Sequence, residues 1–309
     1  MQQGSARPLT VAVTGASGLI GRALVAALRE RGDEVVTLVR REPVSAGERR
    51  WDPATGHLDP QALAGVDAVV NLAGPGVGDK RWTPAYKARV LRDRVSATEA
   101  VAEAVAARLA SDDRAIHLVN ASAVGYYGDR GEELLTEDSP GGLGFLAEVC
   151  RAWEGATQAA SAAGAPVTLA RTGLVMSGAG GALAPLVRAT RLGAGGPMGS
   201  GRQFWPVISR RDEIAALLFL LDHPDLTGPV NLVGVEPPRQ REVAGALGRL
   251  LHRPAILPAP GAALRAVIGE FAGEIMASQR VLPDRLLAAG FVHQDRALTA
   301  VLASALAEE

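Results

Sequence analysis

A glycine-rich turn between an apolar strand and an amphipathic helix constrains the fold of this chain more than any other feature. The turn, Thr14-Gly15-Ala16-Ser17-Gly18-Leu19-Ile20-Gly21, follows the apolar run Leu9-Thr10-Val11-Ala12-Val13. Ile20, Leu24 and Leu28 then recur every four residues and so share one face of a helix. A strand, a glycine turn and a helix in this order predict the phosphate-binding corner of a dinucleotide fold.

Each glycine of the turn has a separate expected role. Gly15 allows a sharp turn, Gly18 lets a pyrophosphate approach the backbone, and Gly21 lets the helix pack close to the strand. The free N–H groups at the start of the helix then hold the anion. An ordinary strand–turn–helix unit that happens to contain three glycines is the alternative. The residues expected to contact the cofactor here are Thr14, Gly15, Ser17, Gly18, Leu19, Ile20 and Gly21.

Two arginines at the end of the second expected strand favour NADP(H) over NAD(H). The strand covers residues 34–39 and is followed by Arg40 and Arg41. In NAD-binding folds an acidic residue about 20 residues beyond the glycine turn holds the ribose hydroxyls. A guanidinium in that place binds a 2′-phosphate through a charge-assisted, bidentate contact. The alternative is that both arginines are solvated loop charges.

Alternating strands and helices predict a Rossmann-like, doubly wound parallel α/β sheet. Further strands are expected at 67–72, 115–120, 166–171 and 229–233, and Thr83 and Pro84 begin a long helix to about residue 109. After residue 233 helical patterns dominate. We therefore expect an NADP-binding domain over 8–175 plus about 208–234. A smaller, mostly helical substrate domain would cover about 176–207 plus 235–309.

Residues that follow the strands are candidates for the ligand site, because ligands of open α/β sheets lie at the carboxyl ends of the strands. We expect Leu72, Ala73, Gly74 and Ala121 to contact the cofactor. Ser122, just past the strand at 115–120, would polarise a substrate carbonyl or else cap its loop. Tyr126 or Tyr127 would donate a proton or form an aromatic lid. Lys80, with Arg81, would bind an anionic substrate or activate a phenol through space, or else remain part of a solvated surface pair.

Composition excludes several other classes of protein. The 309 residues carry 32 Lys and Arg against 33 Asp and Glu, a formal charge of -1, so no net basic field favours nucleic acid or an anionic membrane. No apolar run approaches the ~20 residues of a membrane span, and Met1 to Pro8 lacks the pattern of a secretory signal. We expect a cytoplasmic monomer or homodimer that acts on a small molecule.

Nucleophilic and metal chemistry receive little support from the sequence. Cys150 is the single cysteine, with no histidine near it in sequence, so a packing role is expected. No Gly-x-Ser-x-Gly motif of a hydrolase is present. No metal is expected, because the five histidines are scattered without ligand spacing: His57, His117, His223, His252 and His293.

These segments together resemble the extended short-chain dehydrogenase/reductase superfamily. Within it the chain is similar to an epimerase-like branch, sometimes labelled cell-division inhibitor, whose substrate is not securely assigned. The resemblance implies an NAD(P)-binding fold with a helical C-terminal domain, and it adds Arg171 to the expected cofactor residues. The motifs that carry it are 14–21, Asn71-Leu72-Ala73-Gly74, 79–83, 121–128, Cys150-Arg151-Ala152-Trp153-Glu154, 169–173, Gly201-Arg202-Gln203, 252–255 and Leu282-Pro283.

The chain departs from the superfamily at its catalytic residues. Active members carry a serine, matched by Ser122, and a Tyr-x-x-x-Lys motif in the next helix; Leu146 and Cys150 occupy those two places. A histidine found in relatives is replaced by Ser209 or Arg210. The usual lysine lowers the tyrosine pKa, and a phenol near pKa ~10 is a poor base at neutral pH. We expect an NADP-dependent oxidoreductase of a small carbonyl or alcohol without this dyad, or alternatively a non-catalytic NADP-binding sensor.

Overall fold

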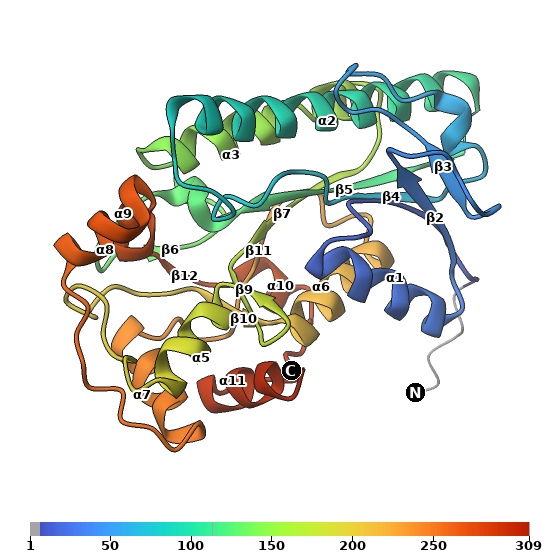
Figure 1. The fold of residues 1–309 in the computed structure, drawn as a ribbon. Helices are drawn as coiled ribbons and strands as arrows, with labels where there is room; N and C mark the ends of the chain where they lie inside the picture. The colour runs from blue at the N-terminus through green and yellow to red at the C-terminus, as the bar shows by residue number, and fades with distance from the viewer. Residues whose placement is uncertain (1–6, 113, 309) are drawn as a thin grey trace.

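A seven-stranded parallel sheet forms the centre of the molecule (Figure 1). The computed structural model describes residues 7–112 and 114–308. The strand order is β11-β7-β5-β4-β1-β2-β3, and the prediction of a doubly wound, Rossmann-like α/β fold is confirmed. The strands are β1 (Thr10–Thr14), β2 (Glu34–Val39), β3 (Glu48–Arg50), β4 (Ala68–Asn71), β5 (His117–Ala123), β7 (Val167–Thr172) and β11 (Gly228–Leu232).

Helices cover both faces of this sheet, as Figure 1 shows. On one face α1 (Leu19–Arg31) packs against α6 (Arg210–Asp222), and the other face carries α2 (Pro84–Ser111), α3 (Phe145–Gly155) and α4 (Gln158–Ala162). Side chains of β1 alternate between the two cores: Val11 and Val13 pack toward α1 and α6, and Ala12 packs toward α2. The central strand β1 therefore contributes apolar side chains to both layers, as expected of a covered parallel sheet.

The remaining elements form a smaller, mostly helical part with two short sheets. A third hydrophobic core gathers α5, α7 and α11 against the three-stranded sheet β10-β8-β9, and a second small sheet pairs β12 with β6. These short strands were not predicted, and the domain boundaries stay a prediction. Two short 3-10 helices pack on the helices of the main sheet, η1 (Pro60–Leu63) against α2 and η2 (Val124–Tyr127) against α3. The other elements are β6 (Leu134–Leu135), β8 (Leu174–Ser177), β9 (Gly180–Gly181), α5 (Leu183–Arg191), β10 (Val207–Ser209), α7 (Gln240–Leu250), α8 (Gly261–Ile268), η3 (Gly269–Phe271), α9 (Ala272–Met276), β12 (Arg280–Val281), α10 (Asp284–Ala288) and α11 (Leu298–Leu306).

The approach of α1 to the glycine turn leaves no room for a side chain at Gly21. A Cβ added there would lie 2.8 Å from the Cα of Ala16 and closer still to the carbonyl oxygen of Gly15. Both neighbours are backbone atoms, which cannot rotate away as a side chain would. The helix start is therefore held against the end of β1 by a contact that only glycine permits.

We predict that Gly21→Ala lowers the free energy of unfolding by about 1–3 kcal/mol, the usual range for overpacking. Gly245→Ala, inside α7, is the matched control, because the nearest atom to an added Cβ there is Arg249 Nη1 at 3.7 Å. The control should gain about 0.5–1 kcal/mol from helix propensity. Urea unfolding of both variants checks the pair, and a Gly21→Ala protein as stable as the parent would contradict the account.

Candidate functional site

The glycine turn brings the predicted cofactor residues of two strands together. Gly15 has φ +64, and a Cβ added to it would lie 2.6 Å from the carbonyl oxygen of Leu72 at the end of β4. The hydroxyl of Thr14 accepts the backbone N–H groups of Leu72 and Ala73 at 2.9 and 3.1 Å. The ends of β1 and β4 thus form one backbone surface.

The start of α1 is open to an anion. Its N-cap, Gly18, contributes no side-chain hydrogen bond, and the first turn carries no acidic residue. The first N–H groups of a helix have no partner within the helix. A Cβ at Gly18 would lie 3.2 Å from the carbonyl oxygen of Gly15, so glycine also leaves the surface of the turn bare. These residues fit a bound diphosphate.

The two arginines after β2 differ in their partners. Arg41 forms an ion pair with Glu48, with Nη2 2.6 Å from Oε1 and Nη1 2.8 Å from Oε2. The hydrogen bond from Arg41, helped by the backbone of Val44, lowers the pKa of Glu48 to about 2. Arg40 is exposed and makes no hydrogen bond or ion pair with the residues that the structure describes. Arg40 is therefore the better candidate for a 2′-phosphate.

The sequence predicts Ser122 just past the end of its strand, but in the structure it lies inside β5. The strand extends three residues beyond the expected end at Asn120, because pairing with β7 continues through Ala123. Ser122 is buried, and its hydroxyl donates to Glu154 Oε1 at 2.6 Å. Its hydroxyl is thus already engaged within the protein.

Arg171 is also engaged internally. Its Nε and Nη2 lie 2.8 and 2.9 Å from the two carboxylate oxygens of Glu154, a bidentate ion pair. Burial alone would lower the pKa of Arg171, but the hydrogen bonds and charge of Glu154 raise it. The pair joins β7 to α3. Arg171, expected to contact the cofactor, here serves as the centre of a buried cluster with Ser122, Tyr126 and Tyr127.

The two tyrosines are in different environments. Tyr127 is fully buried; its hydroxyl donates to Asn231 Oδ1 at 2.8 Å and accepts from Arg171 Nη1 at 3.0 Å. Burial raises the pKa of Tyr127 to about 12, although Arg171 opposes this. This burial weighs against the expectation that Tyr127 reaches a ligand, which stays a prediction. Tyr126 is half-buried with the Arg171 Cζ 3.5 Å above its ring, and its hydroxyl makes no hydrogen bond to the described residues.

Positions that carry catalytic groups in the superfamily have structural partners here. Cys150 is buried, with its Sγ 3.6 Å from the carbonyl oxygen of Ala123, and burial raises its thiol pKa to about 12. That its thiol is not a nucleophile stays a prediction, which the burial supports. Ser209 caps α6 by accepting the N–H of Asp212 at 3.1 Å, and Arg210 pairs with Glu308 at 3.0 Å.

Lys80 is not brought into the Ser122 cluster. It lies exposed in the loop before α2 and makes no hydrogen bond or ion pair with the described residues. The same loop contacts the C-terminal part through Trp82, whose ring centroid lies 5.3 Å from that of Phe271 and 4.9 Å from that of Phe145. This loop therefore links the sheet edge to α9 and its neighbours.

The sequence analysis missed two residues near the carboxyl ends of the strands. It gave Glu154 only a place in a motif of the resemblance, whereas this carboxylate holds both Ser122 and Arg171. It did not single out Arg94, a buried cation on α2. A signal for Glu154 was present, since its motif already carried the resemblance. For Arg94 the sequence offered no signal, because its burial depends on tertiary packing.

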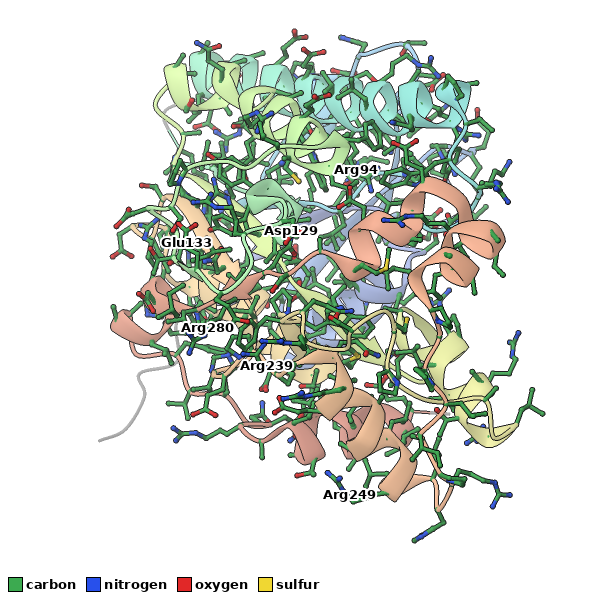
Figure 2. The ribbon with its side chains drawn as sticks, turned by 90° about the vertical axis from the view of Figure 1, so that its left-hand side faces the viewer. Arg94, Asp129, Glu133, Arg239, Arg249 and Arg280 are labelled. Atoms are coloured by element: carbon green, nitrogen blue, oxygen red, sulfur yellow. The ribbon has the colours of Figure 1, made fainter. Side chains whose placement is uncertain are left out.

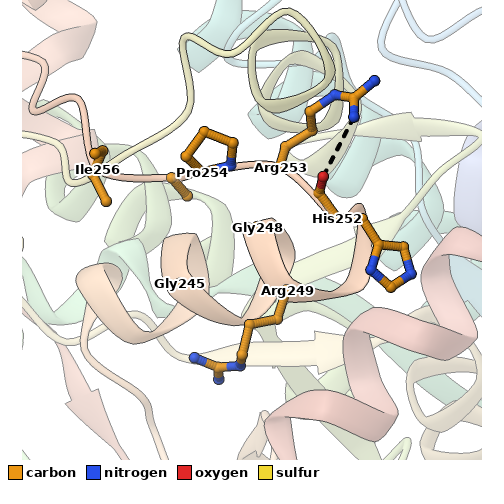
Figure 3. Close-up of a pocket in the computed structure, with 8 residues that line it drawn as sticks. Gly245, Gly248, Arg249, His252, Arg253, Pro254 and Ile256 are labelled. Carbon is orange, nitrogen blue, oxygen red and sulfur yellow. Dashed lines mark hydrogen bonds between the residues drawn. The ribbon is translucent and has the colours of Figure 1, made fainter.

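A surface pocket of 560 Å³ lies away from these residues, at the end of α7 (Figure 3). It is lined by the basic side chains Arg249, His252 and Arg253 and by the following residues to Ile256. Arg253 donates to the carbonyl oxygens of His252 and Arg191 at 3.3 and 3.4 Å. Arg249, in the last turn of α7, complements the helix dipole.

The family follows from comparison with known proteins. Residues 11–234 match the NAD dependent epimerase/dehydratase family, and residues 259–305 match a domain of unknown function, DUF1731. The chain belongs to the NAD dependent epimerase/dehydratase family. The epimerase-like resemblance, with its own C-terminal domain, is confirmed.

Several known proteins are similar to this chain over nearly its whole length. An epimerase family protein of Mycobacterium tuberculosis (strain CDC 1551 / Oshkosh) is 45% identical over 282 residues, 91% of this chain and 92% of the relative. The crystal structure of human epimerase family protein SDR39U1 with NADPH has a TM-score of 0.86 at 30% identity, covering 97% of this chain and 100% of that one. MoeE5, solved with UDP-glucuronic acid and NAD, has a TM-score of 0.76 at 26% identity, covering 97% and 98%.

Among residues 7–112 and 114–308, no group of three or more His, Cys, Asp or Glu side chains is arranged to hold a metal ion. In the same ranges no helix is long and apolar enough to cross a membrane.

Glu213, in the first turn of α6, is a buried carboxyl group beside the end of β7 in this family member. Its Oε1 accepts the hydroxyl of Thr172 at 2.8 Å, and its Oε2 has no partner. Burial raises the pKa of Glu213 to about 8, although the hydrogen bond from Thr172 opposes the shift. The carboxyl group is therefore mostly protonated at neutral pH.

We predict that this group makes the fold less stable as pH rises from 4.5, its ordinary pKa, to about 8. In that window the folded state holds a proton that the unfolded state has lost, so stability falls by up to about 1.4 kcal/mol per pH unit. Glu213→Gln removes the titration, so its unfolding free energy relative to the parent should increase with pH across the window. Urea unfolding at pH 5, 6.5 and 8 measures the difference.

The control is Glu148→Gln, because Glu148 is exposed on α3. Its pH dependence should run parallel to that of the parent. A Glu213→Gln curve that also runs parallel to the parent would show that the Glu213 carboxyl does not titrate in this range.

Proposed function

We propose that this chain is an NADP(H)-dependent oxidoreductase that acts on a small carbonyl or alcohol. Its family, and a similar protein solved with NADPH, support the cofactor class. The exposed Arg40, which has no partner among the described residues, supports the phosphorylated form over NAD(H). When bound, the cofactor supplies or accepts a hydride at its nicotinamide ring.

In this proposal the residues divide into holding and positioning groups. Gly18 and the first N–H groups of α1 hold the pyrophosphate, and Arg40 binds the 2′-phosphate. The backbone of Leu72, Ala73 and Gly74, at the end of β4, lies along the nicotinamide ribose. Ser122 and Tyr127 are positioning residues, because their hydroxyls are committed to Glu154 and Asn231.

The observation that carries the proposed reaction is that the hydroxyl of Tyr126 has no hydrogen-bond partner among the described residues. Of the three predicted hydroxyl groups in the cluster, those of Ser122 and Tyr127 are buried in internal hydrogen bonds. Arg171 stacks on the Tyr126 ring and fixes its orientation. A phenol hydroxyl without a basic partner donates a proton more readily than it accepts one at neutral pH, so reduction of a carbonyl is the favoured direction.

A non-catalytic NADP-binding sensor is the second candidate. It is favoured by the absence of the Tyr-x-x-x-Lys pair, whose positions hold Leu146 and Cys150. Loss of a positioned acid or base costs ~10²–10⁴-fold in rate. A sensor would keep the cofactor surface while turning over no substrate.

The cofactor assignment predicts that Arg40→Met weakens NADPH binding by about 1.5–3 kcal/mol, the range for a hydrogen bond to a charged group. NADH binding should change little, since NADH lacks the 2′-phosphate. Arg41→Met is the control, because Arg41 is already paired with Glu48 and should lose less NADPH affinity. Calorimetric titration measures both. Equal affinity of the parent for NADPH and NADH would refute the preference.

The assignment of Tyr126 as proton donor predicts different effects for two variants that each lose a tyrosine hydroxyl. Once a carbonyl library yields a substrate, Tyr126→Phe should lower kcat by ~10²-fold or more with NADPH affinity nearly unchanged. Tyr127→Phe should mainly lower stability, by about 1–3 kcal/mol, because the buried Asn231 loses its donor.

Steady-state kinetics and urea unfolding separate the two effects. Turnover by Tyr126→Phe at the parental rate would place the proton donor elsewhere. If the protein binds NADPH but turns over no carbonyl or alcohol, the sensor function takes precedence.

A further inference from the structure

Arg94 is a buried cation at the carboxyl end of β4. Figure 2 shows it beneath α2, facing the interior of the molecule. Its side chain is only 9% exposed. Nη2 donates to the carbonyl oxygen of Pro75 at 2.7 Å, Nη1 to that of Val90 at 3.4 Å, and the guanidinium lies 5.0 Å from the ring centroid of Trp153. These partners are neutral.

Arg94 differs in this from the other two buried arginines of residues 7–112 and 114–308. Arg171 is paired with Glu154 at 2.8 Å, and Arg108 with Asp112 at 3.3 Å. Arg94 forms no ion pair with a carboxylate of the described residues. A guanidinium stays charged in proteins, and an uncompensated buried charge is costly.

The two carboxylates that attract Arg94 through space have other partners. Asp79 accepts the backbone N–H of Gly76 at 3.1 Å, and Asp93 is paired with Arg89 at 3.0 Å. Both act on Arg94 only through longer-range attraction, which is too weak to prevent burial from lowering its pKa. The protein thus holds a positive charge here that its own side chains do not neutralise.

The guanidinium is not wholly enclosed by protein atoms. Its Nε makes no hydrogen bond to the described residues, yet it is not among the fully enclosed polar atoms. It faces Gly74, where an added Cβ would lie 3.1 Å from Arg94 Cγ and 3.4 Å from Nε. Gly74 ends the Leu72–Gly74 surface assigned above to the cofactor ribose, so the unpaired charge lies at the edge where ligands of this fold gather.

We propose that Arg94 is the counter-ion of a bound anionic group, a phosphate or carboxylate, at the end of β4 beside Gly74. The inference rests on the proposed function for the position of the ligand, and it adds an anion-binding residue to that site. The group belongs either to the cofactor or to the substrate, which would then be an anionic carbonyl compound.

Three titrations test this with the full-length protein. NADPH is titrated into the free protein, and inorganic phosphate and malonate are titrated separately into the NADPH-saturated protein, or into the free protein if NADPH does not bind. Arg94→Met should weaken at least one of these by 10-fold or more. A loss confined to NADPH identifies a cofactor phosphate, and a loss confined to phosphate or malonate identifies a substrate group.

Arg92→Met is the matched control, because Arg92 lies on the same helix, is exposed, and its side chain pairs with Asp93 at 3.3 Å. It removes the same charge and should leave every titration within 2-fold of the parent. Arg94→Gln covers the case in which Arg94→Met does not fold, since the amide retains a donor for the Pro75 carbonyl while the charge is lost. It should show the same loss of affinity.

The inference and the proposed function fail in different ways. If the parent protein does not bind NADPH, the assignment of the cofactor is overturned. The phosphate and malonate titrations then still test the role of Arg94. Arg94 variants that are less stable but bind every probe like the parent would show a purely structural role and overturn the inference. A parent that binds none of the three probes overturns it as well.

Discussion

The buried ion pair between Arg171 and Glu154 is the interaction on which the candidate site depends. It joins β7 to α3, and it recruits Ser122 of β5 to the carboxylate and Tyr127 to the guanidinium. Because removing one partner of such a pair leaves an uncompensated buried charge, these groups have to be ordered together. The pair also restricts the chemistry. Arg171 cannot release a proton as a lysine does, so it can orient a phenol and stabilise charge but cannot relay a proton.

A second buried network fixes the strand ends beneath this pair. Thr14 of β1 donates to Asn71 of β4 at 2.7 Å, and the Asn71 amide donates to Asn120 and Thr98 at 2.7 and 3.0 Å. Trp153 of α3 donates to the same Thr98 hydroxyl at 2.9 Å. Three neighbouring strands and two helices are thereby held in register. Trp153 is also the ring beneath Arg94, so the charge left unpaired lies on a rigid support.

The sequence predicts the parts of this structure that local chemistry determines. The strand, the glycine turn and the start of the helix could be placed correctly, because apolar spacing and glycine conformations act over a few residues. The short sheets escaped prediction because strands such as β6 and β12 are two residues long and pair across more than 100 residues. The burial of the Tyr127 hydroxyl also depends on non-local contacts, because its partner Asn231 is 104 residues away in the sequence.

The C-terminal region determines which tyrosine is available. β12, within the segment that matches DUF1731, pairs with β6, which follows the turn carrying Tyr126 and Tyr127. The amide of Asn231 donates to the carbonyl oxygen of Leu282 at 2.9 Å while its Oδ1 accepts the Tyr127 hydroxyl at 2.8 Å. Tyr127 is therefore enclosed by an arrangement that the C-terminal segment completes, and Tyr126 remains at the surface of the cluster. The two matched regions consequently act as one unit, because the second fixes the hydrogen bonding of the first.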